Sequence, residues 1–298
     1  MPIAKKSSSK LALLATCSAG VLWGTGALVV NVLVSQYGLS PENISFWRFA
    51  IGSLILLMVF GREIVWVKLK PLVLEILLCG IAMAGYVLFW FFGIEKIGAA
   101  IPTLIALCLP PVIVALISVL RGHEKADIQL VLVIFGALIG TFFIVAKHGS
   151  MAKDVHPHAT LVGVLFSVGS ALLYAGFSMF SGRISIALGA GVATACLSIV
   201  AAGFTSLFTL YQPFIWPVDI PPQVWFLYLG VVTAALALLA YSWGAARLKP
   251  MALTVATLLE PLTAVILSAL FLHEQLSILQ YVGGVLLLWS IWVLGNRK

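Results

Sequence analysis

Apolar residues run along this chain in long stretches that short clusters of Gly, Pro and charged residues separate. A helix needs about 20 apolar residues to cross the ~30 Å hydrocarbon core of a bilayer. The pattern therefore indicates an all-α membrane protein with ten transmembrane helices. The predicted crossings lie near 11–35, 43–60, 71–92, 99–120, 127–147, 160–183, 191–211, 222–243, 251–272 and 278–295.

The overall composition excludes an ordinary soluble domain. Of the 298 residues, 62% are hydrophobic and 9% are charged, whereas a soluble domain is about 45–50% apolar and about 25% charged. The first apolar stretch continues to Val34, which is longer than the apolar region of a cleavable signal peptide. The first crossing is therefore predicted to stay attached, behind a cytoplasmic tail of residues 1–10.

The basic residues predict the orientation of the crossings. With a cytoplasmic N-terminus, 13 of the 17 Lys and Arg residues fall on the inner side, and only Lys96, Lys147 and Lys153 fall on the outer side. Cytoplasmic loops of membrane proteins carry such an excess. We expect a multi-pass protein of the inner (plasma) membrane with both termini cytoplasmic. Because the basic residues occur singly or in pairs, the net charge of +7 does not indicate a nucleic-acid partner.

The chain shows a weak similarity to itself at one offset, 151 residues. The matched prolines and basic residues fall at equivalent places in the fourth and ninth crossings. The matched pairs are Trp23 and Tyr174, Gly93 and Gly244, Lys96 and Arg247, Thr103 and Thr254, and Pro110 and Pro261.

This offset predicts two halves of five helices each, residues 1–147 and 160–298, joined by a polar linker at 148–159. Five crossings are an odd number, so the second half enters the membrane from the opposite side and the repeat is inverted. Inverted repeats with interrupted helices are a recurring plan of secondary transporters, whose substrate site lies near the bilayer midplane.

Four stretches resemble the drug/metabolite transporter superfamily, and within it the EamA family of ten-span carriers. They are "VLWGTGALVVN", "FWRFAIGSLIL", "LIALCLPPVIVALISVLRGHE" and "LLEPLTAVILSALFLHEQLSILQYVGG". The last, with Glu-Pro before an acidic loop and a Gly-rich final crossing, is the most specific. The resemblance implies a carrier, frequently an exporter of amino acids or related metabolites that uses the proton gradient.

A carboxylate lies beside a proline inside the ninth crossing, at Glu260 and Pro261. Glu260 is about nine residues, or roughly 13 Å, from the start of the crossing, near the midplane. A charge at that depth is expected to face a cavity or a partner. Either Glu260 binds a substrate amine or a proton, or it has a structural role. In that case it satisfies backbone that Pro261 leaves unpaired, or it is held protonated in a hydrogen bond between helices.

The fourth crossing carries Pro110 and Pro111 at the matching depth, with Leu109 at the position of the acid. Two adjacent prolines remove two helical hydrogen bonds. We expect a helix interruption that exposes carbonyls to a cavity, or alternatively a kink with only a structural role.

Arg48 lies about one turn inside the outer end of the second crossing. It either pairs with a substrate carboxylate, extends its side chain to the lipid headgroups, or forms a structural pair within the protein.

Aromatic residues with polar tips are candidates for the wall of a binding site. Trp23, Tyr86 and Tyr174 fall near the middle of the first, third and sixth crossings, and Asn31 follows Trp23 by eight residues. The alternatives are aromatic side chains that face lipid or pack between helices, and an interhelical hydrogen bond from Asn31.

No nucleotide-binding or hydrolase motif occurs in the sequence, so neither an enzyme nor a cofactor is expected. The histidines and acid of the linker, His148, His156, His158 and Asp154, predict no metal site. The "GALIG" stretch at 136–140 permits close helix packing, within one protomer or between subunits of a homo-oligomer.

Taken together, these features predict a secondary active transporter that exports amino acids or related small metabolites by alternating access, with proton coupling through Glu260. The alternatives are an uptake carrier, a passive channel and, less favoured, an intramembrane enzyme.

Overall fold

The computed structural model describes residues 2–97, 100–122, 127–145, 157–271 and 276–296, and these are almost entirely helical. Ten segments of this described part are long and apolar enough to cross a membrane, which confirms the predicted all-α, ten-span architecture. The crossings are α1 (Pro2–Tyr37), α2 (Pro41–Phe60), α4 (Val73–Ile97), α5 (Ala100–Leu120), α6 (Ile128–Val145), α7 (Pro157–Leu188), α8 (Ala190–Ser206), α9 (Pro222–Tyr228) with the π-helix η4 (Leu229–Leu236) and α10 (Ala237–Ala245), α11 (Pro250–Ala256) with α12 (Leu259–Phe271), and α13 (Ile278–Asn296).

Four short helical turns complete the described secondary structure. The turns η1 (Gly61–Glu63), α3 (Trp66–Leu69) and η2 (Lys70–Leu72) connect α2 to α4, and η3 (Leu207–Leu210) follows α8.

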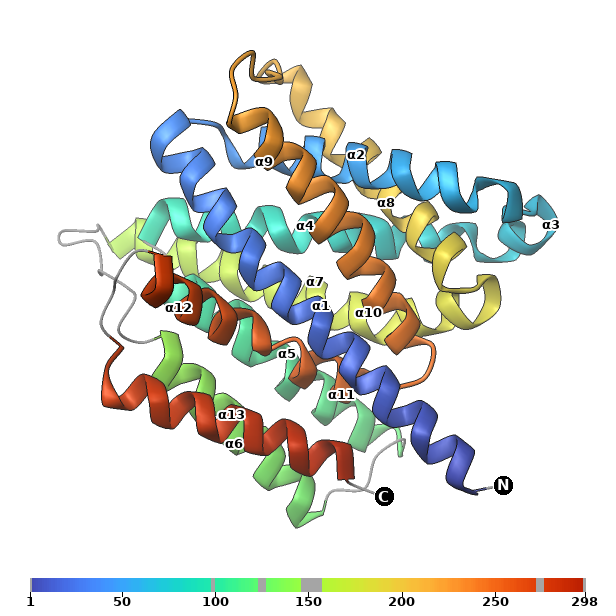
Figure 1. Ribbon diagram of the computed structural model, residues 1–298, viewed down its shortest axis with the longest axis vertical. Helices are drawn as coiled ribbons and strands as arrows, with labels where there is room; N and C mark the ends of the chain where they lie inside the picture. Colours follow the sequence, from blue (N-terminus) through green and yellow to red (C-terminus); the bar gives the residue numbers. More distant parts are fainter. Residues whose placement is uncertain (1, 98–99, 123–126, 146–156, 272–275, 297–298) are drawn as a thin grey trace.

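The closest helix pairs join residues before 147 to residues after 157. α4 lies along α7, α6 along α13 and α2 along α8, while α1 crosses between α12 and α10 (Figure 1). The two predicted halves therefore interlock instead of forming separate bodies, and the space at the centre is enclosed by helices of both. The inverted relation between the halves stays a prediction.

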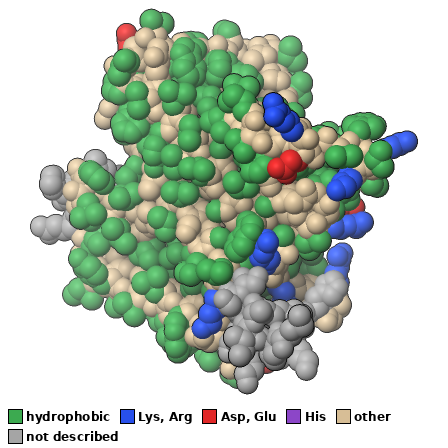
Figure 2. Space-filling model, turned by 45° about the vertical axis from the view of Figure 1, so that its right-hand side comes forward, with side chains coloured by type: hydrophobic (Ala, Val, Ile, Leu, Met, Phe, Trp, Pro, Cys, Tyr) green, Lys and Arg blue, Asp and Glu red, His purple; other side chains and the backbone are tan. Residues whose placement is uncertain are grey.

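The start of α1 and the end of α13 lie toward the same end of the helices (Figure 1). Figure 2 shows Lys and Arg side chains gathered at one side of the molecule, while hydrophobic side chains cover most of the rest of the view. The cytoplasmic location of the termini stays a prediction from the distribution of basic residues. Exposed basic residues near helix ends and in the connections between helices include Arg62, Lys68, Lys70, Arg121, Arg183, Arg247 and Lys249.

The ninth crossing is broken into two helices, α11 and α12, by the turn residues Thr257 and Leu258. Pro261 has no N–H to donate to the carbonyl four residues earlier, which is that of Thr257. That carbonyl instead accepts a hydrogen bond from the backbone N–H of Glu260 at 3.0 Å. The tighter three-residue spacing ends the regular helix one turn before the proline.

The fourth crossing differs from the predicted interruption, because α5 runs as one helix through Pro110 and Pro111. Both prolines are buried. The fixed φ of proline is compatible with a helix, and neighbouring transmembrane helices can compensate for the lost hydrogen bonds. A proline pair in a membrane is thus not sufficient to end a helix.

Glycine allows α1 to approach the break closely. A Cβ atom at Gly24 would lie 2.5 Å from the carbonyl oxygen of Glu260 and 2.6 Å from the Cβ of Thr263. The "GALIG" stretch makes a similar contact within the protomer, since a Cβ at Gly140 would lie 2.7 Å from the carbonyl oxygen of Gly283 in α13. Small residues at these positions permit backbone-to-backbone packing.

Candidate functional site

A central cavity lies between helices of both halves. It consists of a part of about 100 Å³ and a part of about 60 Å³, which share lining residues from α1, α4 and α12. A buried water needs about 10–15 Å³ of such space, so several waters fit. The shared lining residues are Trp23, Ala27, Tyr86, Trp90 and Glu260.

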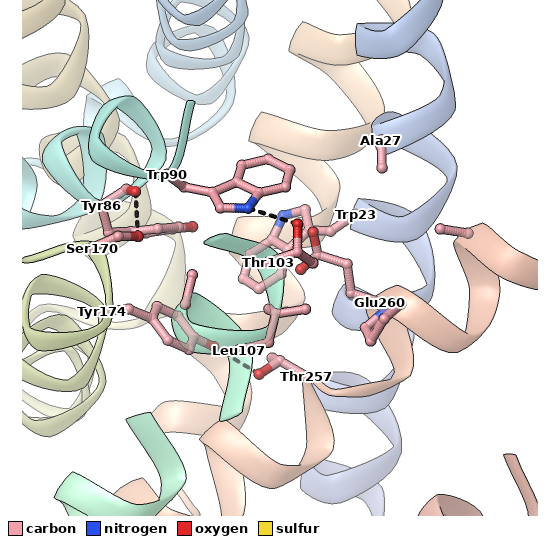
Figure 3. Close-up of a pocket in the computed structure, with 13 residues that line it drawn as sticks. Trp23, Ala27, Tyr86, Trp90, Thr103, Leu107, Ser170, Tyr174, Thr257 and Glu260 are labelled. Atoms are coloured by element: carbon pink, nitrogen blue, oxygen red, sulfur yellow. Dashed lines mark hydrogen bonds between the residues drawn. The ribbon is translucent and has the colours of Figure 1, made fainter. Parts of the chain in front are cut away.

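Glu260 reaches from the first turn of α12 into this cavity (Figure 3). Its side chain is half-buried, and no group in the described part of the chain forms a hydrogen bond or ion pair with its carboxylate. The backbone N–H of Glu260 donates to the carbonyl of Thr257 at the helix break, whereas its carboxylate makes no bond there. The side chain is therefore available to water or a ligand.

Arg48 extends from α2 to line the smaller part of the cavity, on whose wall Glu260 also lies. Its guanidinium carbon is 5.5 Å from the ring centroid of Phe49, and its Nε is buried without a hydrogen-bond partner among the described groups. Arg48 and Glu260, both described, form no ion pair within 4 Å. Two oppositely charged side chains thus face one cavity without forming an ion pair.

The predicted aromatic residues line the cavity with their polar tips already bonded. The indole N–H of Trp23 donates to the carbonyl of Thr233 at 3.0 Å, within the π-helix η4. The hydroxyl of Tyr174 shares a 2.7 Å hydrogen bond with Thr257 at the break, and the Tyr86 and Tyr174 rings are 5.0 Å apart. Their polar tips are thus held in place, and the rings contribute to the cavity wall.

Asn31 does not reach the cavity, and its side chain is exposed. At 3.6 residues per turn, a residue eight positions after Trp23 points about 80° away, whereas one seven positions after it deviates by only about 20°. Val30, at the seventh position, lines the cavity instead.

The residue four positions before each of these prolines lines the cavity. Pro110 and Pro111 do not line it, but Ala106 and Leu107, whose carbonyls they deprive of helical donors, do. Pro261 lines the cavity, as does the corresponding Thr257.

Sequence reasoning missed several polar lining residues that helical spacing relates to predicted ones. Trp90 follows Tyr86 by one turn, and its indole N–H donates to Thr103 at 3.1 Å. Ser170 precedes Tyr174 by one turn and donates to the carbonyl of Tyr86 at 2.6 Å (Figure 3). A polar residue four positions from a predicted site residue lies on the same helix face, and this spacing could have identified Trp90 and Ser170.

No group of three or more His, Cys, Asp or Glu side chains able to hold a metal occurs among the described residues. The linker residues His148, Asp154 and His156 lie outside them.

Comparisons with known proteins agree along nearly the whole chain. The EamA-like transporter family matches residues 10–146 and 161–296. The uncharacterized transporter YwfM of Bacillus subtilis is 25% identical, over 93% of this chain and 90% of its own. The uncharacterized inner membrane transporter YicL of Salmonella typhimurium is 25% identical, over 95% of each chain.

One solved crystal structure has the same fold, with a TM-score of 0.80 and 21% identity over 96% of this chain and 99% of its own. The family and these relatives are transporters, not enzymes. The ten-span helical fold, the double family match and the transporter relatives together show that the chain is a membrane transporter and belongs to the EamA-like transporter family of the drug/metabolite transporter superfamily.

Proposed function

We propose that this transporter is a secondary active carrier that exports amino acids or related small metabolites by alternating access. One observation carries the proposal: Arg48 and Glu260 line one central cavity without pairing with each other. An α-amino acid carries a carboxylate and an ammonium group on the same carbon. It can therefore pair with the guanidinium and the carboxylate at once.

The energetics favour a ligand of that kind. Charged side chains within a membrane are costly unless they have a partner or face water. A zwitterion supplies both missing partners and adds no net charge to the cavity. The rings of Trp23, Tyr86 and Tyr174 would contact the apolar part of the substrate.

The irregular helices beside the cavity support alternating access. The break between α11 and α12 and the π-helix η4 both contact the wall, through Thr257 and Thr233 respectively. Interrupted helices at a central site are typical of secondary transporters, and π-helical turns are frequent at functional sites. The sequence carries no ATP-binding motif, so an ion gradient is the proposed energy source.

Glu260 is the proposed coupling residue. When the substrate ammonium leaves, a proton takes its place on the carboxylate, so the cavity is never left with an unpaired acid. Outward substrate movement would then accompany inward proton movement.

The test is counterflow of radiolabelled amino acids in proteoliposomes that contain the wild type or Glu260→Gln. We expect saturable counterflow from the wild type and loss of both rate and pH dependence from Glu260→Gln. The matched control is Glu95→Gln on α4, whose acid is 65% exposed and lies outside the cavity. An unchanged rate and pH profile in Glu260→Gln would contradict the role of Glu260.

The alternative functions give different results. Flux without counterflow indicates a channel, and chemical turnover without translocation indicates an enzyme. Extracellular accumulation in cells that overproduce the protein, absent with Glu260→Ala, separates export from uptake.

A further inference from the structure

Apart from the central cavity, a groove lies between α4 and α7. It has a volume of about 230 Å³ and shares no lining residue with either part of the central cavity. One lining residue is polar, Glu75, and it lies near the start of α4. The others are Leu78, Cys79, Ala82, Gly176, Phe177 and Phe180.

The polar end of the groove holds two opposite charges. An oxygen of Glu75 lies 3.3 Å from a guanidinium nitrogen of Arg183, whose side chain is 70% exposed. The second carboxylate oxygen, Oε2, is buried and has no hydrogen-bond partner among the described groups. A buried acceptor without a donor is costly, so this oxygen is a binding position for a cationic N–H group. Arg183 keeps N–H donors free for an anion.

The apolar end of the groove extends away from these charges into the membrane. From Glu75 to Ala82, α4 rises by roughly 10 Å. Phe177 is buried at the base, while Leu78 and Phe180 are exposed. A Cβ at Gly176 would meet no described atom within 4 Å, so this glycine leaves the groove open.

We propose that this groove binds a phosphatidylethanolamine molecule. Its ammonium group donates to Glu75, its phosphate pairs with Arg183, and one acyl chain lies against Phe177 beside Gly176. A zwitterionic headgroup matches an acid and a base 3.3 Å apart, and arginine is well suited to phosphate. Basic side chains between transmembrane helices bind lipid headgroups in this way.

Two other common phospholipids fit the polar end less well. The quaternary ammonium of phosphatidylcholine has no N–H to donate to the unpaired oxygen of Glu75. Phosphatidylglycerol has hydroxyl donors but no cation, so its headgroup leaves a net negative charge beside the carboxylate. The groove therefore selects by headgroup, and this selection does not depend on which substrate the central cavity transports.

The test uses the delipidated full-length protein in detergent, and native mass spectrometry measures retention of three phospholipids with identical acyl chains. We expect phosphatidylethanolamine to bind about tenfold more tightly than phosphatidylcholine or phosphatidylglycerol, because only its headgroup brings a cationic N–H donor to the carboxylate of Glu75. Equal retention of the three lipids overturns the proposal. Competition by soluble glycerophosphoethanolamine at equal concentration overturns the requirement for an acyl chain.

Matched variants test the position of the site. Gly176→Leu fills the groove and is expected to lower phosphatidylethanolamine retention about tenfold, whereas Gly203→Leu on α8, where a Cβ also meets open space, leaves it unchanged. Glu75→Gln is expected to remove the preference over phosphatidylcholine without blocking the groove. Thermal melting by circular dichroism checks that each variant is folded. If Gly176→Leu retains phosphatidylethanolamine like the wild type, or Glu75→Gln still prefers it to phosphatidylcholine, the lipid does not bind in this groove.

Discussion

The fourth and ninth crossings carry proline at matched positions, Pro110 and Pro261, yet one is a continuous helix and the other is two helices. In both, the residue four positions before the proline lines the central cavity. They differ in the residue directly before it. Leu109 lines an apolar groove formed with residues of α6 and α7, whereas Glu260 lines the cavity.

The difference shows what a helix break can do beyond exposing backbone. Because α5 is one continuous helix, the directions in which Ala106 and Leu109 point are fixed relative to each other. In the ninth crossing, the turn at Thr257 and Leu258 allows α12 to rotate about its axis independently of α11. The acid beside Pro261 can then face the same cavity as the residues at the break.

The largest expected effect comes from moving the acid between the two crossings. Glu260→Leu is expected to lower counterflow in proteoliposomes about 100-fold, since it removes the proposed partner of the substrate ammonium, and losing one partner of a buried charge pair costs about 2–5 kcal/mol. Adding Leu109→Glu should not restore counterflow, because Leu109 lines the apolar groove formed with α6 and α7 and not the central cavity. Rescue to near the wild-type rate would mean that the two positions are equivalent in the working carrier.

A smaller effect is expected from removing the prolines. Pro261→Ala returns a backbone donor to the carbonyl of Thr257, so α11 and α12 can join into one helix. Transport should fall about tenfold because the interruption at the cavity is lost. Thermal stability should stay equal or rise, because the restored N–H gains a backbone acceptor while proline in the first turn of a helix is already tolerated. Pro110→Ala is the control and should change transport less, since α5 is already continuous. Equal losses in both variants would show that the break has no special role.

The contact that holds the broken helix against α1 is expected to show mainly in stability. Gly24→Ala places a methyl group against the carbonyl of Glu260 and the side chain of Thr263. Overpacking of this kind costs about 1–3 kcal/mol, so the melting temperature in detergent should fall. Gly203→Ala, where a Cβ meets open space, should melt like the wild type. The same melting temperature in both variants would indicate that α1 and α12 separate easily.

The smallest expected effect is the loss of one hydrogen bond at the break. Tyr174→Phe removes the hydroxyl that bonds Thr257 but keeps the ring in the cavity wall. The free energy of unfolding should fall by about 0.6–1 kcal/mol, the usual value for an interhelical hydrogen bond in a membrane. The control is Tyr281→Phe, because that side chain is 63% exposed. A change above that of Gly24→Ala would make Tyr174 the main restraint on the break.

Much of the candidate site was predictable from single residues. A charge or polar aromatic in the middle of an apolar stretch needs a partner, and this reasoning selected Glu260, Arg48, Trp23, Tyr86 and Tyr174, all of which line the cavity. Asn31 was selected because it follows Trp23 by eight residues, and it lies outside the cavity. Spacing along one helix fixes which residues share a face, but not which neighbour that face meets.

The sequence by itself determined the ten crossings, because the thickness of the bilayer sets the length of each apolar stretch. It also located the polar groups within those stretches. Only the tertiary structure decided that α5 continues through two prolines while the ninth crossing breaks at Thr257, and that Arg48 and Glu260 share a cavity without pairing. The rotation of each helix about its axis depends on packing against helices distant in the sequence, and no local pattern specifies it.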